Sequence, residues 1–108
     1  MIARLWTTGV HPGMEPVYDD FARTFSRPMF ESLPGCLGAF FLGTGPARSV
    51  LSLWADRASI DALDHSPLYT QTVERFLATG ALRAPQTTAV WVVTGGTVNA
   101  AALAASMP

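Results

Sequence analysis

The chain has 108 residues and a formal net charge of −1; 49% of its residues are hydrophobic and only 14% are charged. This length corresponds to one domain, and the balanced charge gives no basis for a nucleic-acid partner or an acidic membrane surface. The sequence contains no lysine, which excludes Schiff-base chemistry on a lysine amine. The single cysteine, Cys36, excludes an internal disulfide and a metal site of several thiolates, and is expected to be a small buried hydrophobic residue.

The first third of the chain predicts a strand followed by a helix. Residues 2–8 alternate in side-chain parity and are rich in strand-forming types, which indicates a strand. After a turn rich in Gly and Pro, Met14, Val17 and Phe21 recur at steps of three and four residues, as on one face of a helix. Pro28 lacks a backbone donor and is expected to kink or end this helix.

The rest of the chain predicts three more strands and two more helices. Residues 36–42 and 48–54 are strand-like and are separated by a glycine-rich loop. A short helix is expected over 57–63, and Ser66-Pro67 is a strong start signal for another. The last strand is expected over 87–93. The order β-α-β-β-α-β predicts an α+β, ferredoxin-like fold with a four-stranded antiparallel sheet.

The predicted strands are apolar on both faces. In the segment 36–42 one parity carries Ala39 and Phe41, and the other carries Phe40 and Leu42. Helices can cover only one face of so small a sheet, so the other face predicts a partner surface. We therefore expect a homodimer through the sheet face. Residues 1–94 form the predicted domain, and 95–108 are expected to be an alanine-rich flexible tail or a segment that docks on the dimer partner.

Few polar residues form a pattern that indicates chemistry. Asp19 and Asp20 are adjacent on a helix and point in different directions, as solvated carboxylates do. Of the two histidines, His11 lies in a turn, whereas His65 precedes a helix start. His65 is either a base or ligand that reaches into a pocket, or a junction residue that caps free carbonyls. Two histidines without clustered acids predict no metal site.

The aromatic residues are the most informative candidates for a site. The predicted registers place Trp6, Phe40, Trp54 and Trp91 on one face of the sheet, the face covered by helices. Tryptophans in that position either belong to the core or line a hollow for a flat aromatic ligand, with their indole N–H groups as orienting donors.

Three segments carry a family resemblance: Leu33–Gly38 after the first helix, Leu51–Arg57 at the entry to the short helix, and Ser66-Pro67. With them, residues 1–94 resemble the antibiotic biosynthesis monooxygenase family. The resemblance implies ferredoxin-like protomers whose sheets associate into a dimeric α/β barrel. The family includes cofactor-free oxygenases of polyphenolic polyketide intermediates and haem-degrading enzymes.

The resemblance carries over few functional residues. The strand tryptophan of the anthrone-type oxygenases corresponds to Trp54, while their asparagine, tyrosine and helix arginine fall on Val50, Ile60 and Val73. In the haem-degrading branch, the key asparagine falls near Trp6. The tryptophan of the short helix falls near Leu63 and the axial histidine near Val73. None of these three is kept, so haem degradation is the least favoured function.

These observations predict a cytoplasmic, cofactor-independent monooxygenase that acts on an aromatic, polyketide-like small molecule in an apolar pocket. The alternative is a dimeric module that binds a hydrophobic small molecule without turning it over. His65 or Tyr69 is the expected base, and Trp54 is expected to stack on the substrate; no cofactor and no metal are expected. The expected ligand-binding residues are Trp6, Phe21, Phe25, Phe40, Val50, Ile60, Leu63, Val73 and Trp91.

Overall fold

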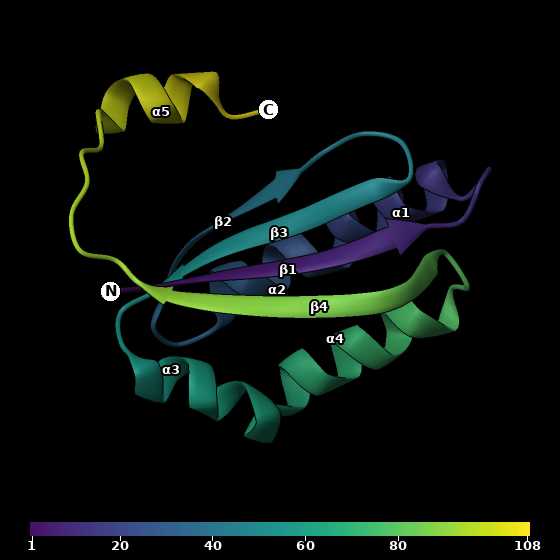
Figure 1. The fold of residues 1–108 in the computed structure, drawn as a ribbon, viewed down its shortest axis with the longest axis horizontal. Coiled ribbons are helices and arrows are strands. Elements are labelled where there is room, and N and C mark those ends of the chain that lie inside the picture. The colour runs from purple at the N-terminus through teal and green to yellow at the C-terminus, as the bar shows by residue number, and fades with distance from the viewer.

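The computed structural model describes all 108 residues, from Met1 to Pro108 (Figure 1). The elements in chain order are β1 (Ile2–Val10), α1 (Glu15–Phe21), the π-helical turn η1 (Ala22–Ser26), α2 (Arg27–Ser32), β2 (Cys36–Leu42), β3 (Ala47–Trp54), α3 (Arg57–Asp61), the 3₁₀ turn η2 (Ala62–His65), α4 (Pro67–Ala78), β4 (Leu82–Val92) and α5 (Ala100–Ser106).

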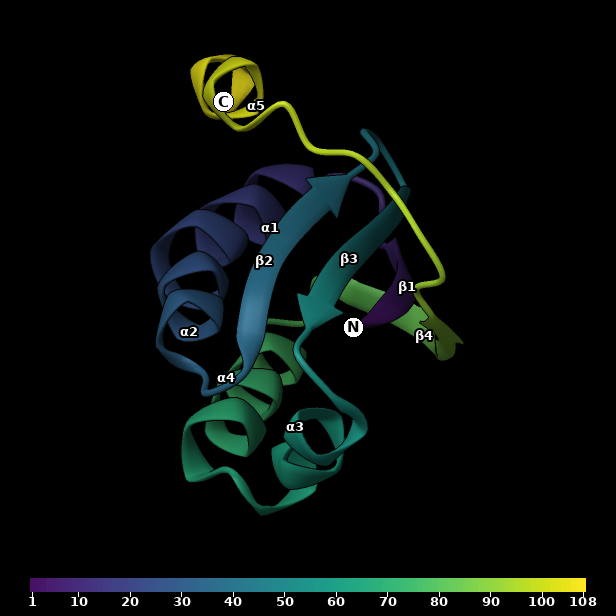
Figure 2. The ribbon, with the colours of Figure 1, turned by 90° about the vertical axis from the view of Figure 1, so that its left-hand side faces the viewer.

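The four strands form one antiparallel sheet in the order β2-β3-β1-β4. The helices α1, α2 and α4 lie on the same side of this curved sheet, and the other side carries no helix of the domain (Figures 1 and 2). The β-α-β-β-α-β order and this strand order confirm the predicted ferredoxin-like α+β fold.

The predicted effect of Pro28 on the first helix is only partly right. The helical path continues past it to Ser32 instead of ending there. One wide turn precedes the proline, in which the N–H of Arg27 donates to the carbonyl of Ala22, five residues back. Pro28 then stands in the first turn of α2, where no helical N–H is required. The π turn thus absorbs the proline without breaking the helix.

The start signals of the later helices act as the sequence indicates. The carboxylate of Asp56 accepts a hydrogen bond from the N–H of Ser59 at 2.9 Å and begins α3. The hydroxyl of Ser66 accepts one from the N–H of Tyr69 at 3.3 Å and begins α4, with Pro67 in the first turn. These caps fix where α4 begins and therefore which of its residues face the sheet.

Two strands are longer than their local patterns predict. β1 extends to Val10 and β4 begins at Leu82, because Gly9 pairs with Arg83 and Val10 pairs with Leu82 beyond an irregularity after Thr7. This extension depends on cross-strand hydrogen bonding between segments far apart in the chain, so the alternation of either segment alone does not indicate it.

The face of the sheet without helices is apolar, and we call it the open face. The register aligns Phe40, Leu51 and Leu5 across three strands, and beside them Leu53, Ala3 and Trp91. Trp91 is 54% exposed. A soluble monomer seldom leaves a contiguous apolar surface of this kind uncovered.

On the covered face, buried side chains form two separate clusters. The first has seven residues and centres on Trp54 with Phe30, Met29 and Leu63. The second has six and centres on Tyr18 with Phe21 and Phe76 near the other end of the helices. The two clusters belong to one layer between sheet and helices, and the half-buried Phe41 packs against both.

The C-terminal segment continues past β4 and forms α5, which has no buried residue. Nothing lies within 4 Å of the Cβ positions of Gly95 or Gly96. The segment curves past the edge of the sheet (Figure 2). Met107 lines a groove with residues of α2 and β2. No helix of the chain combines the length and apolar character needed to cross a membrane.

Candidate functional site

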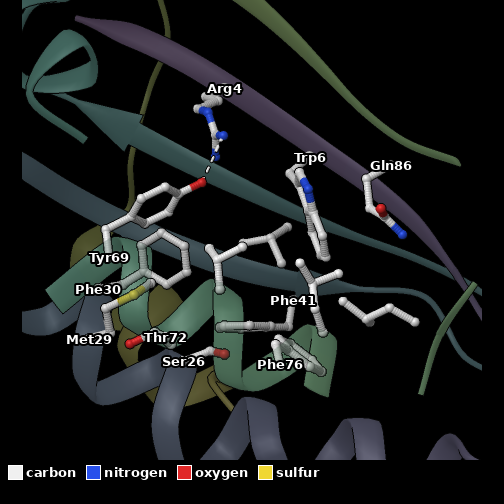
Figure 3. A pocket seen from close by; sticks show the side chains of 14 residues that line it. Arg4, Trp6, Ser26, Met29, Phe30, Phe41, Tyr69, Thr72, Phe76 and Gln86 are labelled. Carbon is white, nitrogen blue, oxygen red and sulfur yellow. Dashed lines mark hydrogen bonds between the residues drawn. The ribbon is translucent and has the colours of Figure 1, made fainter. Parts of the chain in front are cut away.

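A cavity of about 150 Å³ lies between the sheet and the helices, where the two core clusters meet. Ten of its 14 lining residues are hydrophobic. The lining is Arg4, Trp6, Ser26, Met29, Phe30, Phe41, Val50, Tyr69, Thr72, Val73, Phe76, Leu77, Leu82 and Gln86 (Figure 3). The second cluster provides Phe76, and the first provides Met29, Phe30 and Val50. The cavity therefore lies between the two clusters and is partly open to solvent; Leu77 of its lining is 50% exposed.

Strand alternation and helical spacing bring these side chains together. Arg4 and Trp6 share the parity of the buried Ile2 in β1, so both point toward the helices. On α4, Tyr69, Val73 and Phe76 follow one another at steps of four and three residues, which places them on one face.

Polar groups in the lining are few, and most are already engaged. The guanidinium of Arg4 donates to the hydroxyl of Tyr69 at 3.0 Å across the cavity (Figure 3). The hydroxyl of Thr72 donates to the carbonyl of Leu68 at 2.7 Å, within its own helix. The side-chain amide of Gln86 donates to the hydroxyl of Thr8 at 3.2 Å. The Arg4–Tyr69 pair is the one polar link that spans from the sheet to a helix in this site.

Four of the predicted site residues line the cavity: Trp6, Val50, Tyr69 and Val73. Two predicted catalytic residues do not. His65 is exposed at the end of η2. Trp54 is 0% exposed inside the first core cluster, where its indole N–H donates to the hydroxyl of Ser52 at 2.8 Å. Of the three predicted catalytic side chains, the structure brings only Tyr69 to the cavity.

The remaining helix residues of the prediction lie beside the cavity. Leu63 belongs to the first cluster, and Ile60 packs against that cluster. Phe21 is buried in the second cluster, where its ring stacks on Phe76 at a centroid distance of 4.2 Å. Phe25 is 45% exposed and contacts Phe21 with a tilted ring. These four side chains pack around the cavity without lining it.

The predicted placement of Phe40 and Trp91 on the covered face is wrong. Phe40 is paired with Leu51, and Trp91 is paired with Ala3, so both belong to the open face. Directly paired residues of adjacent strands lie on the same face. A bulge between Cys36 and Gly38 shifts the alternation of β2 by one residue and so determines which of its side chains face the helices. Phe41 takes the position in the cavity that the prediction gave to Phe40.

Sequence reasoning also missed Arg4. The alternation Ile2, Arg4, Trp6 already indicated that Arg4 shares a face with a predicted ligand-binding tryptophan. A basic residue on the inward parity of a strand was therefore a usable signal. Ser26, Met29 and Phe30 could not be found in this way, because the π turn sets the angle at which they project.

Two further titratable groups lie outside the cavity. Burial raises the pKa of Tyr18 to about 12, and its hydroxyl has no hydrogen-bond partner. The neighbouring Arg48 is paired with the carboxylate of Asp19, and its guanidinium lies 4.9 Å from the centre of the Tyr18 ring. Burial also raises the pKa of the Cys36 thiol, which is half-buried in β2. No group of three or more His, Cys, Asp or Glu side chains is placed to hold a metal ion.

No protein-family model matches the chain, and no curated protein matches it in sequence. Solved structures do match its fold. A putative antibiotic biosynthesis monooxygenase from Nitrosomonas europaea superposes with a TM-score of 0.74 at 12% identity, over 88% of this chain and 100% of that one.

Two other matches are oxygenases by description. A monooxygenase from the gene ActVA-Orf6 of Streptomyces coelicolor, in complex with nanaomycin D, gives a TM-score of 0.75 at 16% identity, over 92% of both chains. SnoaB, a cofactor-independent oxygenase from Streptomyces nogalater, gives 0.67 at 14% identity, over 88% of this chain and 94% of that one. The chain therefore has the fold of the antibiotic biosynthesis monooxygenases.

Proposed function

We propose that the protein is a cofactor-independent monooxygenase that acts on an aromatic small molecule in the cavity between sheet and helices. The observation that carries this proposal is the cavity itself, a partly open space between sheet and helices whose lining is mostly apolar and includes Trp6 and Tyr69. The fold shared with oxygenases supports it. An aromatic ring would pack against Trp6, Phe41 and Phe76, which surround the space.

In the proposed reaction the substrate supplies the electrons. A CH₂ group activated by an adjacent aromatic system loses a proton, and the resulting carbanion reduces O₂. The overall balance is R₂CH₂ plus O₂ to R₂C=O plus H₂O. The protein would contribute an apolar site that orients the substrate and a group that handles the proton. Tyr69 is the predicted catalytic residue whose hydroxyl lies in the cavity, and Arg4 fixes the position of that hydroxyl.

Oxygen uptake with a hydroxylated anthrone tests this function. The wild-type protein, treated with a chelating resin, is expected to accelerate uptake, and Tyr69→Phe is expected to lower kcat/KM at least about tenfold. His11→Ala, which changes the exposed turn histidine, is the control. His65→Ala tests whether His65, the other predicted base, takes part in the reaction. Unaltered oxygen uptake in this variant would remove His65 from the mechanism. Stoichiometric binding of the anthrone without uptake would favour the non-catalytic binding module, and a strong Soret shift with haem would favour haem degradation.

We further propose that the functional unit is a homodimer in which two open faces pack together. The apolar rows through Leu5, Leu51 and Trp91 support this arrangement, because the domain has nothing of its own that covers them. We also propose that the segment 95–108 contacts the partner subunit. A seven-residue helix with no buried residue is not stable in isolation, so α5 requires a surface to pack on.

A further inference from the structure

We propose that Arg4 recognises a carboxylate on the ligand, so that the cavity binds small aromatic carboxylates in preference to neutral aromatic molecules. This inference rests on the cavity being the binding site of the proposed function, but it does not require turnover. It gives Arg4 a role in ligand binding that neither the family resemblance nor the proposed reaction assigns to it.

The first argument is that Arg4 has no charged partner. The chain contains two ion pairs, Arg23 with Asp20 and Arg48 with Asp19, and neither involves Arg4. The partner of Arg4 within the site is the neutral hydroxyl of Tyr69, whose ring centre is 5.8 Å from the guanidinium carbon. A guanidinium carries five N–H donors, so donors remain after this hydrogen bond.

The second argument comes from the other arginine on the covered face. Arg48 shares the inward parity of β3 with Val50, and it is buried. Its charge is matched by Asp19, and its Nε donates to the carbonyl of Gly45 at 2.9 Å. The fold therefore provides a carboxylate, that of Asp19, for an arginine that lines no ligand cavity. At Arg4, in the same layer, it supplies none.

The third argument is the apolar surroundings of the Arg4 guanidinium. Arg4 points toward Tyr69 with Trp6 beside it, in a cavity whose lining has few polar side chains (Figure 3). Arg4 is half-buried, so its remaining N–H donors can exchange water for a ligand that enters the cavity. A carboxylate matches the planar guanidinium with two parallel hydrogen bonds, and charge-assisted bonds of this kind are the stronger ones.

The shape of the cavity fixes the rest of the ligand. Its volume of about 150 Å³ is of the order that holds one benzene ring in an engineered apolar cavity of another protein. A ring attached to the carboxylate would thus occupy the space between Trp6 and Phe76 while the carboxylate meets Arg4. Larger ring systems would extend toward Leu77, where the cavity approaches the surface.

Calorimetric titration with benzoate and with benzamide tests the proposal, because the two probes have nearly the same shape and differ in charge. Wild-type protein is expected to bind benzoate at least about tenfold more tightly than benzamide. Arg4→Met is expected to abolish that preference, because benzoate loses a charge-assisted hydrogen bond where benzamide loses a weaker neutral one, whereas Arg4→Lys retains part of it. Arg57→Gln removes an exposed arginine outside the cavity and is the matched control for net charge.

Equal affinities of the wild-type protein for the two probes would overturn the proposal, as would an unaltered preference in Arg4→Met. If Arg4→Met fails to give a cooperative thermal transition, the wild-type comparison and Arg4→Lys decide. The indole N–H resonance of Trp6, followed by NMR during the titration, reports whether benzoate occupies this cavity; no shift on binding would also count against it. Failure of the oxygenase assay together with a strong benzoate preference would refute turnover while supporting Arg4 recognition.

Discussion

Tyr18 provides the sharpest test of how this small core is stabilised. Its side chain is only 2% exposed, and its hydroxyl has no hydrogen-bond partner in the structure. A buried unsatisfied hydroxyl costs about 1–3 kcal/mol. Tyr18→Phe removes that oxygen and keeps the ring, which contacts Phe76 at a centroid distance of 5.2 Å and lies under Arg48. We expect the substitution to raise the free energy of unfolding at pH 7 by about 1–2 kcal/mol.

The same residue predicts a pH dependence. Burial raises the pKa of Tyr18 from its ordinary value of 10.0 to about 12. Below pH 10 the hydroxyl is neutral in both the folded and the unfolded state. Between pH 10 and pH 12 it ionises in the unfolded chain first, so the wild-type protein loses stability there, by at most about 2–3 kcal/mol. Tyr18→Phe lacks this loss, and its advantage over the wild type should therefore widen across that window.

Urea denaturation followed by circular dichroism, at one fixed protein concentration and at several pH values from 7 to above 10, measures both effects. Tyr69→Phe is the matched control, because the chain has two tyrosines and the hydroxyl of Tyr69 does have a partner in Arg4. Its stability should fall slightly or stay unchanged. A Tyr18→Phe variant that is at least about 1 kcal/mol less stable than the wild type, or pH profiles that stay parallel above pH 10, would refute the reasoning.

Three further predictions concern the core, the open face and a helix start. Trp54→Phe is expected to lower the free energy of unfolding by about 1–3 kcal/mol, because it opens a void in the first cluster and leaves Ser52 without its donor; a fully stable variant in urea denaturation would contradict this. Leu51→Arg places a charge on the open face and should halve the mass measured by light scattering, whereas Gln71→Arg, on the exposed side of α4, should not; a wild-type mass of one subunit would rule out the dimer. Ser66→Ala should cost about 1 kcal/mol in the same urea assay through loss of the α4 cap, and an unchanged midpoint would mean that the cap is dispensable.

Much of the architecture was predictable because it is encoded locally. The alternation around Trp6, the Gly-Pro punctuation at Pro34-Gly35 and the caps at Asp56 and Ser66 act over a few residues, and each forms the element that its pattern indicates. The order of those elements then leaves few possible sheet topologies. The apolar character of both strand faces is likewise a property of the residues themselves, and the structure retains it.

The candidate site was less predictable, because the residues that line it depend on which side chains of each strand and helix point into the space between sheet and helices. A bulge after Cys36 sets which residues of β2 face the helices, and the π turn before Arg27 sets how the first helical layer projects onto the sheet. The bulge and the wide turn each insert one residue, and so shift the side chains that follow by one position. No single segment contains that information, since a bulge or a wide turn is stabilised by the elements packed against it.

Trp54 and Arg4 illustrate the difference between what the sequence determines and what the tertiary structure determines. The sequence by itself determined that both residues belong to strands with one face toward the helices. Tertiary packing decided that the tryptophan fills a closed core, while the arginine faces a cavity that no side chain fills. This cavity is the space left between two clusters of packed side chains, so it depends on volumes and distances between segments that are remote in the chain.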